Sequence, residues 1–494
     1  MSDGNTVVMA VDLGTTNCKA AVFDVEGKPL AISRSEYTSE RRPLVPDDWL
    51  YATVSNIEAA LKWSKVNPHE VSGLGFSTRA GDLMAFLDYD DRPIQPKVDF
   101  EEVASIREEL EAKLFPQHLE ELLGNVGIVP WVIWMQRKNR NDFEKISKIM
   151  GYKDYVIYKL TGVFAADVLD KEAGRRAVTF CENEHIIEPV TPKLPPLYPP
   201  TTIIGTLKPE WASRFGFKSS MPVVVGGRDG TCATTGVGAT RIGQACSTIA
   251  SSVCIRVISD RPLIDFPKNR IDNRIHSIPG LWLVDNTPGG GTVCLRWFRD
   301  ELGQIENQVA GLTHGNPYFY YDEEANLTPP GADGLIFIPS MAGMNVPVKN
   351  RKARGVLFGL RQEHTKGHII RAILEGIIFA NLSGARIIEN MGGRFDEIRT
   401  TGGGTRSPVW NQIQADIMNK PVVTSSVEEP ECLGVSIFIS VALGIYPTIA
   451  DAIKVMVRTK DVYQPRPQYR DVYERQFKLY ESLCFGLEDV FKKL

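Results

Sequence analysis

The sequence lacks the patterns of a disulfide-rich, nucleic-acid-binding or membrane protein. Its eight cysteines are scattered without a C-x-x-C pair, which predicts buried thiols rather than a zinc site or a disulfide framework. Basic residues alternate with acidic ones and the net charge is only −4, so no nucleic-acid partner is expected. Residues 1–8 lack the regions of a signal peptide, and the most apolar helix candidate, 368–388, carries charged side chains. We therefore expect a cytoplasmic protein without a membrane partner.

The composition is that of a large globular protein. Of the 494 residues, 43% are hydrophobic and 23% are charged, which is close to the average of soluble domains and excludes a disordered or fibrous chain. Because a single core stops growing at about 250–300 residues, we expect two or more domains.

The first segment that predicts a functional site is residues 7–24. Two apolar runs of strand length flank a polar turn, which is typical of a β-hairpin. In this turn Gly14 lets backbone N–H groups approach a phosphate, Thr15 and Thr16 add hydroxyl donors, and Asp12 is suited to a magnesium ion, usually through waters. An ordinary hairpin turn with solvated hydroxyls is the alternative that this stretch leaves open.

Three later segments also combine strands, glycines and polar side chains in a way that is typical of ligand sites. A strand at 222–225 runs through a pair of glycines to Asp229 and a helix of small residues, where the simplest role of that carboxylate is a helix N-cap. Residues 244–257 repeat the strand, turn and strand of the first hairpin, with Ala250, Ser251 and Ser252 in the turn. Residues 402–404 are glycines that open a helix, and they leave room for a flat base and ribose beside a helix N-terminus.

These segments resemble the FGGY family of carbohydrate kinases. The resemblance rests on D-L-G-T-T at 12–16, on DYVIYKLTG at 154–162, on the glycine-rich segment 355–360 with the helix that follows it, and on the glycines with S-P-x-W-x-Q-x-x-A-D at 402–416. It implies an α/β fold of two actin-like, ribonuclease H-like ATPase domains flanking a nucleotide cleft. The first domain would be residues 1–242, with the phosphate hairpin and the sugar site. The second would be 243–494, with the adenosine site and, as its closing core helix, the apolar segment after Glu431.

The resemblance also implies roles for individual residues. Asp229 would be the catalytic base, which mainly orients the attacking hydroxyl in a loose phosphoryl transfer. Asp12 and Asp229 would hold Mg²⁺, and Arg79, Asp82, Asp99 and Asp229 would bind the substrate. The residues implied for ATP are Asp12, Gly14, Thr15, Thr16, Asn17, Ser251, Ser252, Gly402, Gly403, Gly404, Asn411 and Gln412.

The sugar site departs from the family pattern. Arg79 and Asp82 stand in the turn that holds substrate hydroxyls, although an exposed salt bridge is the alternative for this pair. In the family pattern W-x-D-x-R only Asp99 matches, because Lys97 and Glu101 replace the Trp and the Arg. Elsewhere, Ile128 and Val129 stand where the family's first signature has a lysine, and Ala250 replaces a phosphate-turn glycine, which restricts the turn to negative φ.

Three functions are compatible with this sequence. The leading hypothesis is a kinase that transfers the γ-phosphate of ATP to a hydroxyl of a small sugar or polyol, with a pentulose-type acceptor favoured. An autoinducer-type kinase is supported by Arg79 alone. A non-catalytic nucleotide-binding regulator is favoured by Glu101, Val129 and Ala250, and it is opposed by Asp229, since a mere binder needs no base. The resemblance also allows a homodimer.

Overall fold

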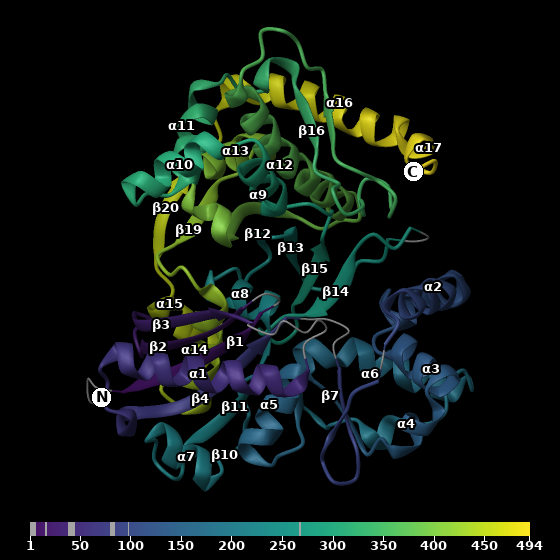
Figure 1. The fold of residues 1–494 in the computed structure, drawn as a ribbon, viewed down its shortest axis with the longest axis vertical. Coiled ribbons are helices and arrows are strands. Elements are labelled where there is room, and N and C mark those ends of the chain that lie inside the picture. Colours follow the sequence, from purple (N-terminus) through teal and green to yellow (C-terminus); the bar gives the residue numbers. More distant parts are fainter. Residues whose placement is uncertain (1–5, 15–16, 38–44, 80–83, 97, 266–267) are drawn as a thin grey trace. The chain divides into compact units, whose positions relative to one another are not determined.

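The chain forms two compact units in the computed structural model, which describes residues 6–14, 17–37, 45–79, 84–96, 98–265 and 268–494 (Figure 1). The first unit contains Met1–Thr240, Arg274–Leu281 and Glu429–Arg458. The second contains Arg241–Asn273, Trp282–Glu428 and Thr459–Leu494. Each unit is therefore built from more than one stretch of sequence.

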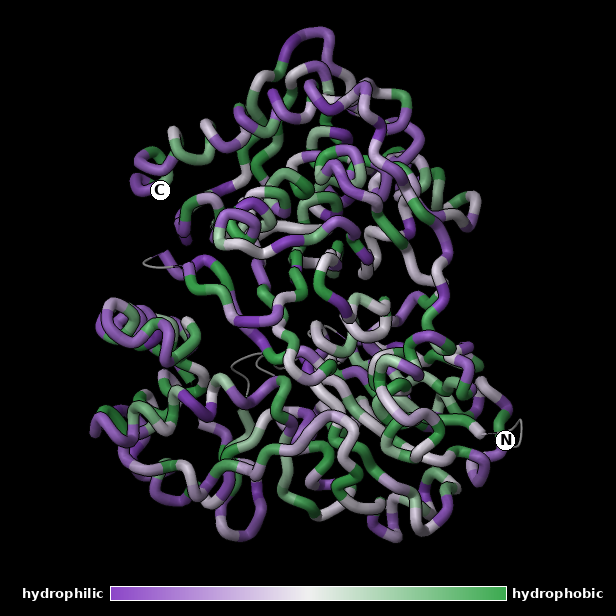
Figure 2. Tube along the Cα trace, turned by 180° about the vertical axis from the view of Figure 1, so that it is seen from behind, coloured by the Kyte–Doolittle hydropathy of each residue, from purple (hydrophilic) through white to green (hydrophobic). Residues whose placement is uncertain are grey.

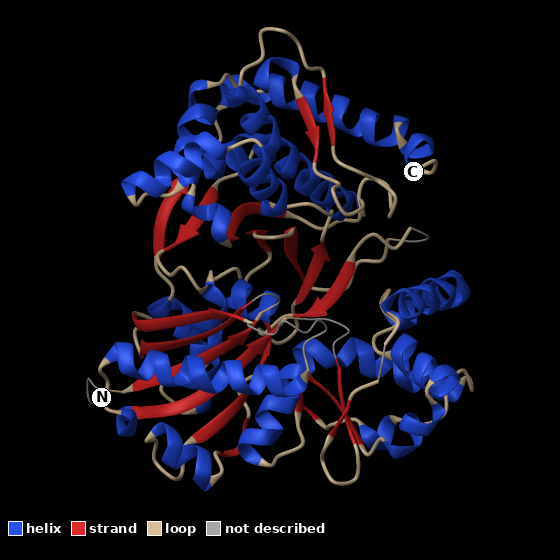
Figure 3. Cartoon of the chain, viewed as in Figure 1, coloured by secondary structure: helices blue, strands red, loops and turns tan. Residues whose placement is uncertain are grey.

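The first unit is organised around a six-stranded sheet in the order β10-β11-β4-β1-β2-β3 (Figure 3). Its strands are β1 Val7–Leu13, β2 Asn17–Asp24, β3 Pro29–Glu36, β4 Val71–Thr78, β10 Ile203–Thr206 and β11 Pro222–Arg228. β1, β4 and β11 are parallel, whereas β2, β3 and β10 run antiparallel to their neighbours. The hairpin prediction is confirmed, and its strands extend beyond the apolar runs because Asp12 also pairs with Lys19 in the ladder.

Helices pack on both faces of this sheet, and each face is formed by alternate residues of the strands. Met9 and Val11 of β1 share a core with Trp49 and Ile57 of α1 (Pro46–Ser64) and with α5 (Tyr152–Thr161). Residues that alternate with these point to the other side of a pleated sheet. There, Gly73 and Gly75 of β4 lie against α14 (Pro430–Ala442), which packs with α8 (Asp229–Gly236) and is followed by α15 (Ile449–Met456).

The placement of α14 corrects the sequence analysis. We expected this helix in the second domain, but it belongs to the first unit, and Figure 1 shows its yellow-green ribbon beside the purple strands. Residues 432–440 of α14 are buried on every side. A helix that is apolar all round has no polar face to indicate which sheet will cover it.

The remainder of the first unit is built on two small sheets. One has the order β6-β5-β7, and the other pairs β8 with β9 in parallel. These strands are β5 Met84–Leu87, β6 Pro93–Ile94, β7 Lys148–Gly151, β8 Ala166–Asp167 and β9 Leu197–Tyr198, and the helices are α2 Phe100–Leu122, α3 Val129–Lys138, α4 Arg140–Lys145 and α6 Val168–Asn183. Helix α7 (Pro209–Phe215) instead shares the core of the six-stranded sheet through Ala212 and Phe215. Figure 2 shows hydrophilic residues along much of α2, in agreement with its many charged side chains.

The second unit repeats the arrangement of the first around a seven-stranded sheet in the order β14-β15-β13-β12-β18-β19-β20. Its strands are β12 Gly243–Ile249, β13 Val253–Ser259, β14 Asp272–Ile275, β15 Trp282–Asn286, β18 Phe395–Thr401, β19 Val422–Ser425 and β20 Thr459–Tyr463, and the last two residues of β14, Arg274 and Ile275, are counted with the first unit. β12 and β13 form an antiparallel hairpin, while β18 and β19 continue parallel to β12. In the first sheet the hairpin of β1 and β2 is likewise followed by the parallel strands β4 and β11. The repeated hairpin pattern in the sequence predicted this likeness.

Helix α12 (Lys366–Asn390) is the core helix of the second unit. Among the described residues it alone is long and apolar enough to cross a membrane by length and composition, and 89% of its apolar window is buried inside the structure. The other helices of this unit are α9 Thr292–Glu301, α10 Gln304–Thr313, α11 Pro317–Leu327, α13 Pro408–Met418, α16 Arg470–Gly486 and α17 Glu488–Phe491, and a small hairpin pairs β16 Ile336–Ile338 with β17 Val356–Phe358.

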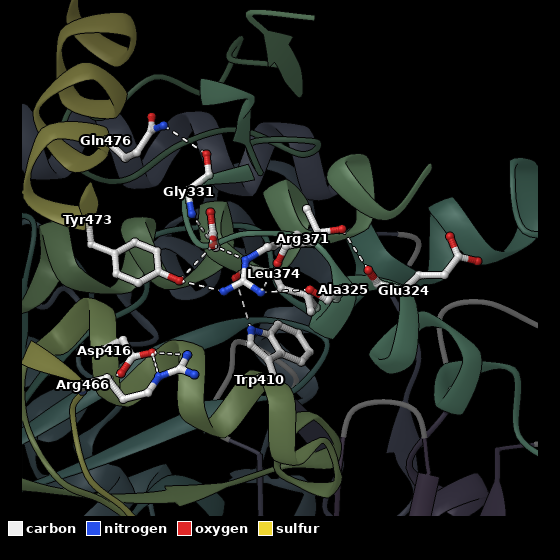
Figure 4. A network of polar contacts seen from close by, with 12 residues as sticks. Glu324, Ala325, Gly331, Arg371, Leu374, Trp410, Asp416, Arg466, Tyr473 and Gln476 are labelled. Atoms are coloured by element: carbon white, nitrogen blue, oxygen red, sulfur yellow. Dashed lines mark hydrogen bonds and ion pairs between the residues drawn. The ribbon is translucent and has the colours of Figure 1, made fainter. Parts of the chain in front are cut away.

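A buried polar network joins α12 to its neighbours (Figure 4). The Arg371 guanidinium donates to Glu375 Oε1 at 2.7 Å, to the Tyr473 hydroxyl at 2.9 Å and to two backbone carbonyls at the end of α11. Glu375 Oε1 also accepts from the Gly331 N–H and from the Tyr473 hydroxyl, both at 3.0 Å. The charges of this pair are thus compensated inside the core, as buried charges require.

Candidate active site

The parallel strands of the first unit place three predicted site segments at one sheet edge. Asp12 of β1 is paired in register with Ser77 of β4, and Ser77 is paired with Gly227 of β11. The next row joins Leu13, Thr78 and Arg228. Two strand spacings make the distance between the Asp12 and Gly227 Cα atoms about 10 Å. Asp12 and Asp229 therefore lie at the same carboxyl edge of the sheet, where α/β folds bind ligands.

Asp12 is the buried end of an ionic cluster. Its carboxylate is 2% exposed, accepts a hydrogen bond from Ser77 Oγ at 2.6 Å and lies 3.4 Å from Lys19 Nζ. Lys19 Nζ is also 2.6 Å from Glu429, the N-cap of α14, and 3.8 Å from Glu431 in the first turn of this helix. Burial opposes the charge on Lys19, but the three carboxylates outweigh it and raise its pKa. Lys19 therefore stays charged beside the predicted phosphate turn.

The structure describes the two ends of the predicted phosphate turn, Gly14 and Asn17. The Gly14 N–H donates to the Asn17 carbonyl at 3.1 Å, and the Tyr37 hydroxyl donates to the Gly14 carbonyl at 3.2 Å. A Cβ at position 14 would lie 3.0 Å from the Asn17 carbonyl oxygen, so the turn is tight enough to favour glycine. Thr15 and Thr16 lie outside the described residues, and their assignment to phosphate stays a prediction.

Asp229 is the first residue of α8, one residue after the end of β11. The helix N-cap is Arg228, so Asp229 is not the cap itself, although its carboxylate Oδ1 accepts the Gly230 N–H at 2.6 Å. A helix N-terminus stabilises a negative charge. The Asp229 carboxylate thus lies at the sheet edge beside a helix N-terminus, a position that suits a base or orienting group.

Helices α8 and α14 approach each other through glycines. A Cβ on Gly236 would lie 2.0 Å from the Pro430 carbonyl oxygen, and a Cβ on Gly434 would lie 2.0 Å from the Cys232 carbonyl oxygen. Side chains at these positions would push the helices apart. The contact fixes α8, and with it Asp229, against the helix that carries Glu431.

The predicted sugar-site residues are not gathered by any contact that the structure shows. Arg79 is exposed, and its N–H continues the ladder by donating to the Leu13 carbonyl at 3.0 Å. Asp99 caps α2, since its carboxylate accepts the N–H groups of Glu101 and Glu102 at 2.9 and 3.1 Å. Asp82 and Lys97 lie outside the described residues. The acceptor role of Arg79, Asp82 and Asp99 stays a prediction.

The second unit holds the predicted adenosine and second phosphate segments at one sheet edge. Thr248 of β12 pairs in register with Thr401 of β18, so the turn after β12 and the glycines after β18 are neighbours. A Cβ on Gly402 would lie 2.5 Å from the Ile249 carbonyl oxygen, and one on Gly404 would lie 2.3 Å from Ile249 Cγ2. At Gly403 no atom lies within 4 Å of such a Cβ, so this glycine borders open space that a nucleotide could use.

Two predicted nucleotide residues, Asn411 and Gln412, make their hydrogen bonds within the protein. Asn411 is 1% exposed, and its Nδ2 donates to the Thr405 carbonyl at 2.8 Å. Gln412 Nε2 donates to Asp416 Oδ1 and to the Gln464 carbonyl. Both side chains therefore bind the protein itself, and a direct contact with nucleotide stays a prediction.

The turn with Ser251 and Ser252 rests on a glycine that sequence analysis missed. Gly291 has a φ of 143°, and a Cβ there would lie 2.5 Å from the Ser251 carbonyl oxygen and 2.7 Å from that of Ala250. The Thr292 N–H donates to the Ala250 carbonyl at 2.8 Å. Ala250 itself has no positive φ, as expected from its side chain. The run of glycines at 289–291 was the signal for this support.

The candidate site offers carboxylates to a metal ion but no preformed set of protein ligands among the described residues. In the described part of the chain, no group of three or more His, Cys, Asp or Glu side chains could hold a metal. Mg²⁺ usually keeps several waters and takes one or two carboxylates together with substrate phosphates. Asp12 and Asp229 fit this requirement by their chemistry, and the Ser77 and Lys19 partners of Asp12 favour contact through water.

Comparison with known proteins agrees with this architecture. Residues 7–236 match the model of the FGGY family of carbohydrate kinases, N-terminal domain, and residues 250–443 match the C-terminal domain of the same family. Gluconokinase from Bacillus licheniformis is 28% identical, with 99% of this chain and 97% of that protein covered. Xylulose kinase from Staphylococcus epidermidis is 24% identical, with 97% and 96% covered.

Solved structures share the fold. The crystal structure of gluconate kinase from Lactobacillus acidophilus has a TM-score of 0.87 at 23% identity, with 99% of both chains covered. A ligand-bound xylulose kinase from the same organism has a TM-score of 0.85 at 24% identity, also with 99% of both chains covered. The two units thus have the actin-like kinase fold that the sequence predicted, and the chain belongs to the FGGY family of carbohydrate kinases, which are phosphotransferases.

Proposed function

We propose that this chain transfers the γ-phosphate of ATP to a hydroxyl of a small polyhydroxylated acceptor, with Asp229 as the group that orients this hydroxyl and takes its proton. The observation that carries the proposal is the register of β1, β4 and β11. It brings the phosphate turn after Asp12 and the helix that begins with Asp229 to one sheet edge.

The chemistry requires little covalent participation by the protein. The acceptor oxygen forms a bond to the γ-phosphorus, the bond from this phosphorus to the β,γ-bridging oxygen breaks, and ADP leaves. In a loose transition state the proton departs late, so the main task of Asp229 is to hold the hydroxyl in line. Lys19, which is paired with Asp12 and Glu429, would hold the Asp12 carboxylate in position.

ATP is the phosphate donor of FGGY kinases, and we assign its phosphates to the turns at 14–17 and 250–252 and its adenosine to residues 402–404. Mg²⁺ bound through Asp12 and Asp229 would neutralise phosphate charge. Closure around the substrates would exclude water and so limit hydrolysis of ATP.

The acceptor class is open between two kinds of relative. The sequence analysis favoured a pentulose, which the xylulose kinases among the relatives support, whereas the gluconokinases support an aldonate. In the described part of the chain, Arg79 donates its backbone N–H to the sheet and Asp99 caps α2, and these contacts do not decide between the two acceptors.

A coupled assay of ADP release tests the proposal. D-xylulose, D-ribulose, glycerol, D-gluconate and an autoinducer precursor would be supplied one at a time with ATP and Mg²⁺. We expect one acceptor to raise ADP release, and Asp229→Asn to lower the rate by about 10²–10⁴-fold. The matched control is Asp90→Asn, since the Asp90 carboxylate makes only an exposed ion pair with Arg92. ATP binding without turnover for any acceptor would indicate the non-catalytic regulator instead.

A further inference from the structure

The first unit contains a cavity that the family resemblance does not assign. Its volume is about 40 Å³, and its wall is formed largely by apolar side chains of β5, β7 and residues 194–197. A water molecule needs roughly 10–15 Å³ of such volume, so the cavity has room for a few waters or for a carboxylate group. Three charged side chains interrupt the apolar wall, namely Asp154, Lys171 and Arg175.

Arg175 is a cation without a carboxylate partner. Its Nη2 donates to the Pro195 carbonyl at 2.6 Å, and within the described chain it makes no ion pair. Burial lowers the pKa of Arg175, and Glu172 and Glu182 counteract this effect only in part. Two carboxylates act on it only from a distance, because Glu172 pairs with Arg176 and Glu182 accepts backbone N–H groups. A guanidinium offers five N–H donors in a fork that matches a carboxylate.

Lys171 adds a second cation on the same helix face. It precedes Arg175 by four residues on α6, and residues at this spacing lie one above the other. Lys171 Nζ is 2.6 Å from Asp170 Oδ2. Burial alone would lower the pKa of Lys171, but Asp170 and Asp154 outweigh this effect and raise it, so the side chain remains charged.

Asp154 is held within the protein and compensates part of the charge of Lys171. Its Oδ1 lies 3.1 Å from Lys153 Nζ, and its Oδ2 accepts the Gly151 N–H at 3.2 Å. Lys171 is thus paired with Asp170 in the cavity wall, whereas Arg175 is the lining cation that has no ion pair in the described part of the chain.

The same ionic chain connects the cavity to the strand that leads to Asp229. Lys153 is fully buried, pairs with Asp167 at 2.9 Å and donates to the Val225 carbonyl of β11 at 3.0 Å. Asp167 Oδ1 would lie 3.8 Å from a Cβ on Gly227, two residues before Asp229. The cavity wall and the predicted base are thus attached to one rigid framework.

We propose that Lys171 and Arg175 bind the carboxylate of the acceptor, so that the preferred acceptor is an aldonate, a polyhydroxy monocarboxylate. This inference rests on the proposed function and names the substrate class of that site. A neutral ketose or polyol would leave the Arg175 guanidinium without a counter-ion in a partly apolar cavity, which is unfavourable.

The test compares acceptors with and without the carboxylate. D-gluconate and D-glucitol share a six-carbon polyhydroxylated chain, and only D-gluconate carries the charge. Hydrogen bonds to charged groups correspond to changes of roughly 10- to 150-fold. We expect Arg175→Met to raise the KM for D-gluconate by this factor, while kcat and the KM for ATP change by less than about twofold.

Arg176→Met is the matched control. Arg176 is the next residue of α6, is exposed and pairs with Glu172 at 3.7 Å. It should leave the KM for D-gluconate within about twofold of the wild type. Circular dichroism and the thermal midpoint of both variants separate loss of the site from loss of the fold.

Each outcome decides between the two proposals. If the wild type uses D-xylulose or glycerol but not D-gluconate, or if Arg175→Met leaves the KM for D-gluconate unchanged, the carboxylate site is refuted while the kinase proposal stands. If no acceptor is phosphorylated, the proposed function fails, and calorimetry with D-gluconate alone decides on the site. The carboxylate site is supported if the wild type and Arg176→Met bind D-gluconate and Arg175→Met does not. It is refuted if the wild type does not bind D-gluconate.

Discussion

The contact between α8 and α14 predicts a large effect for Gly434→Ala. The new Cβ would lie 2.0 Å from the Cys232 carbonyl oxygen, and the obstructing atom belongs to the backbone, so no side-chain rotation relieves the clash. The helices must separate by more than 1 Å to reach ordinary van der Waals distance from this 2.0 Å contact. Overpacking of a core costs about 1–3 kcal/mol, and a backbone clash belongs at the upper end of this range.

Gly434→Ala should lower both the thermal stability of the first unit and the rate of phosphoryl transfer. At about 2–4 °C per kcal/mol for a unit of this size, a loss of 3 kcal/mol lowers the midpoint of the first unit by roughly 6–12 °C. Because α8 begins with Asp229, the displacement also moves the carboxylate, and a 1 Å misplacement can lower kcat by about 10²-fold.

Differential scanning calorimetry and the ADP-release assay give the two measurements. Gly311→Ala is the control, because this exposed glycine in α10 has no atom within 4 Å of a new Cβ, and the change should stabilise its helix by about 0.5–1 kcal/mol. A Gly434→Ala protein with the wild-type midpoint and kcat would refute the conclusion that this contact positions Asp229.

Three further predictions concern buried charges. Arg371→Met should destabilise the second unit by about 3–5 kcal/mol in urea denaturation, because Glu375 loses its counter-ion, and the double variant with Glu375→Leu should recover most of the loss. Burial lowers the pKa of His276 to about 4, below the value of the unfolded chain, so its contribution to stability is present above about pH 6.5 and is lost as the pH falls toward 4. Thermal midpoints of His276→Gln should show a shallower decline over this range, and an equal decline would contradict the assignment. Burial, with Asp12 and Glu429 nearby, raises the pKa of Glu431 to about 7 despite Lys19, so stability falls as the pH rises from about 4.5 to 7. Glu431→Gln should flatten this part of the pH profile, and an unchanged slope would contradict it.

Local patterns in the sequence predicted much of the candidate site. The turn after Asp12 and the glycines at 402–404 are recognisable because strand alternation and glycine runs act over a few residues. The capping role of Asp99 was missed, because Asp99 was assigned to the acceptor, although an acidic residue three positions later, Glu102, is typical of a helix start. Asp229 was predicted with its helix, and the register of β11 with β4 then showed which edge it occupies.

Features that depend on distant contacts could not be predicted. Helix α14 is apolar on all sides, so its sequence is compatible with either unit. The pairing of Lys19 with Glu429 joins residues more than 400 positions apart, and no local pattern indicates it. The cavity with Lys171 and Arg175 is assembled from β5, β7, α6 and a loop, and charged residues at i and i+4 on a helix usually mark a solvated face.

The most direct test of phosphoryl transfer is the product balance. Phosphorus NMR of a reaction with ATP, Mg²⁺ and the acceptor that raises ADP release should show one new phosphomonoester for each ADP formed, and this signal should be absent with Asp229→Asn. Inorganic phosphate in place of the phosphomonoester, or an equal yield from Asp229→Asn, would contradict the role of this site in transferring phosphate to an acceptor hydroxyl.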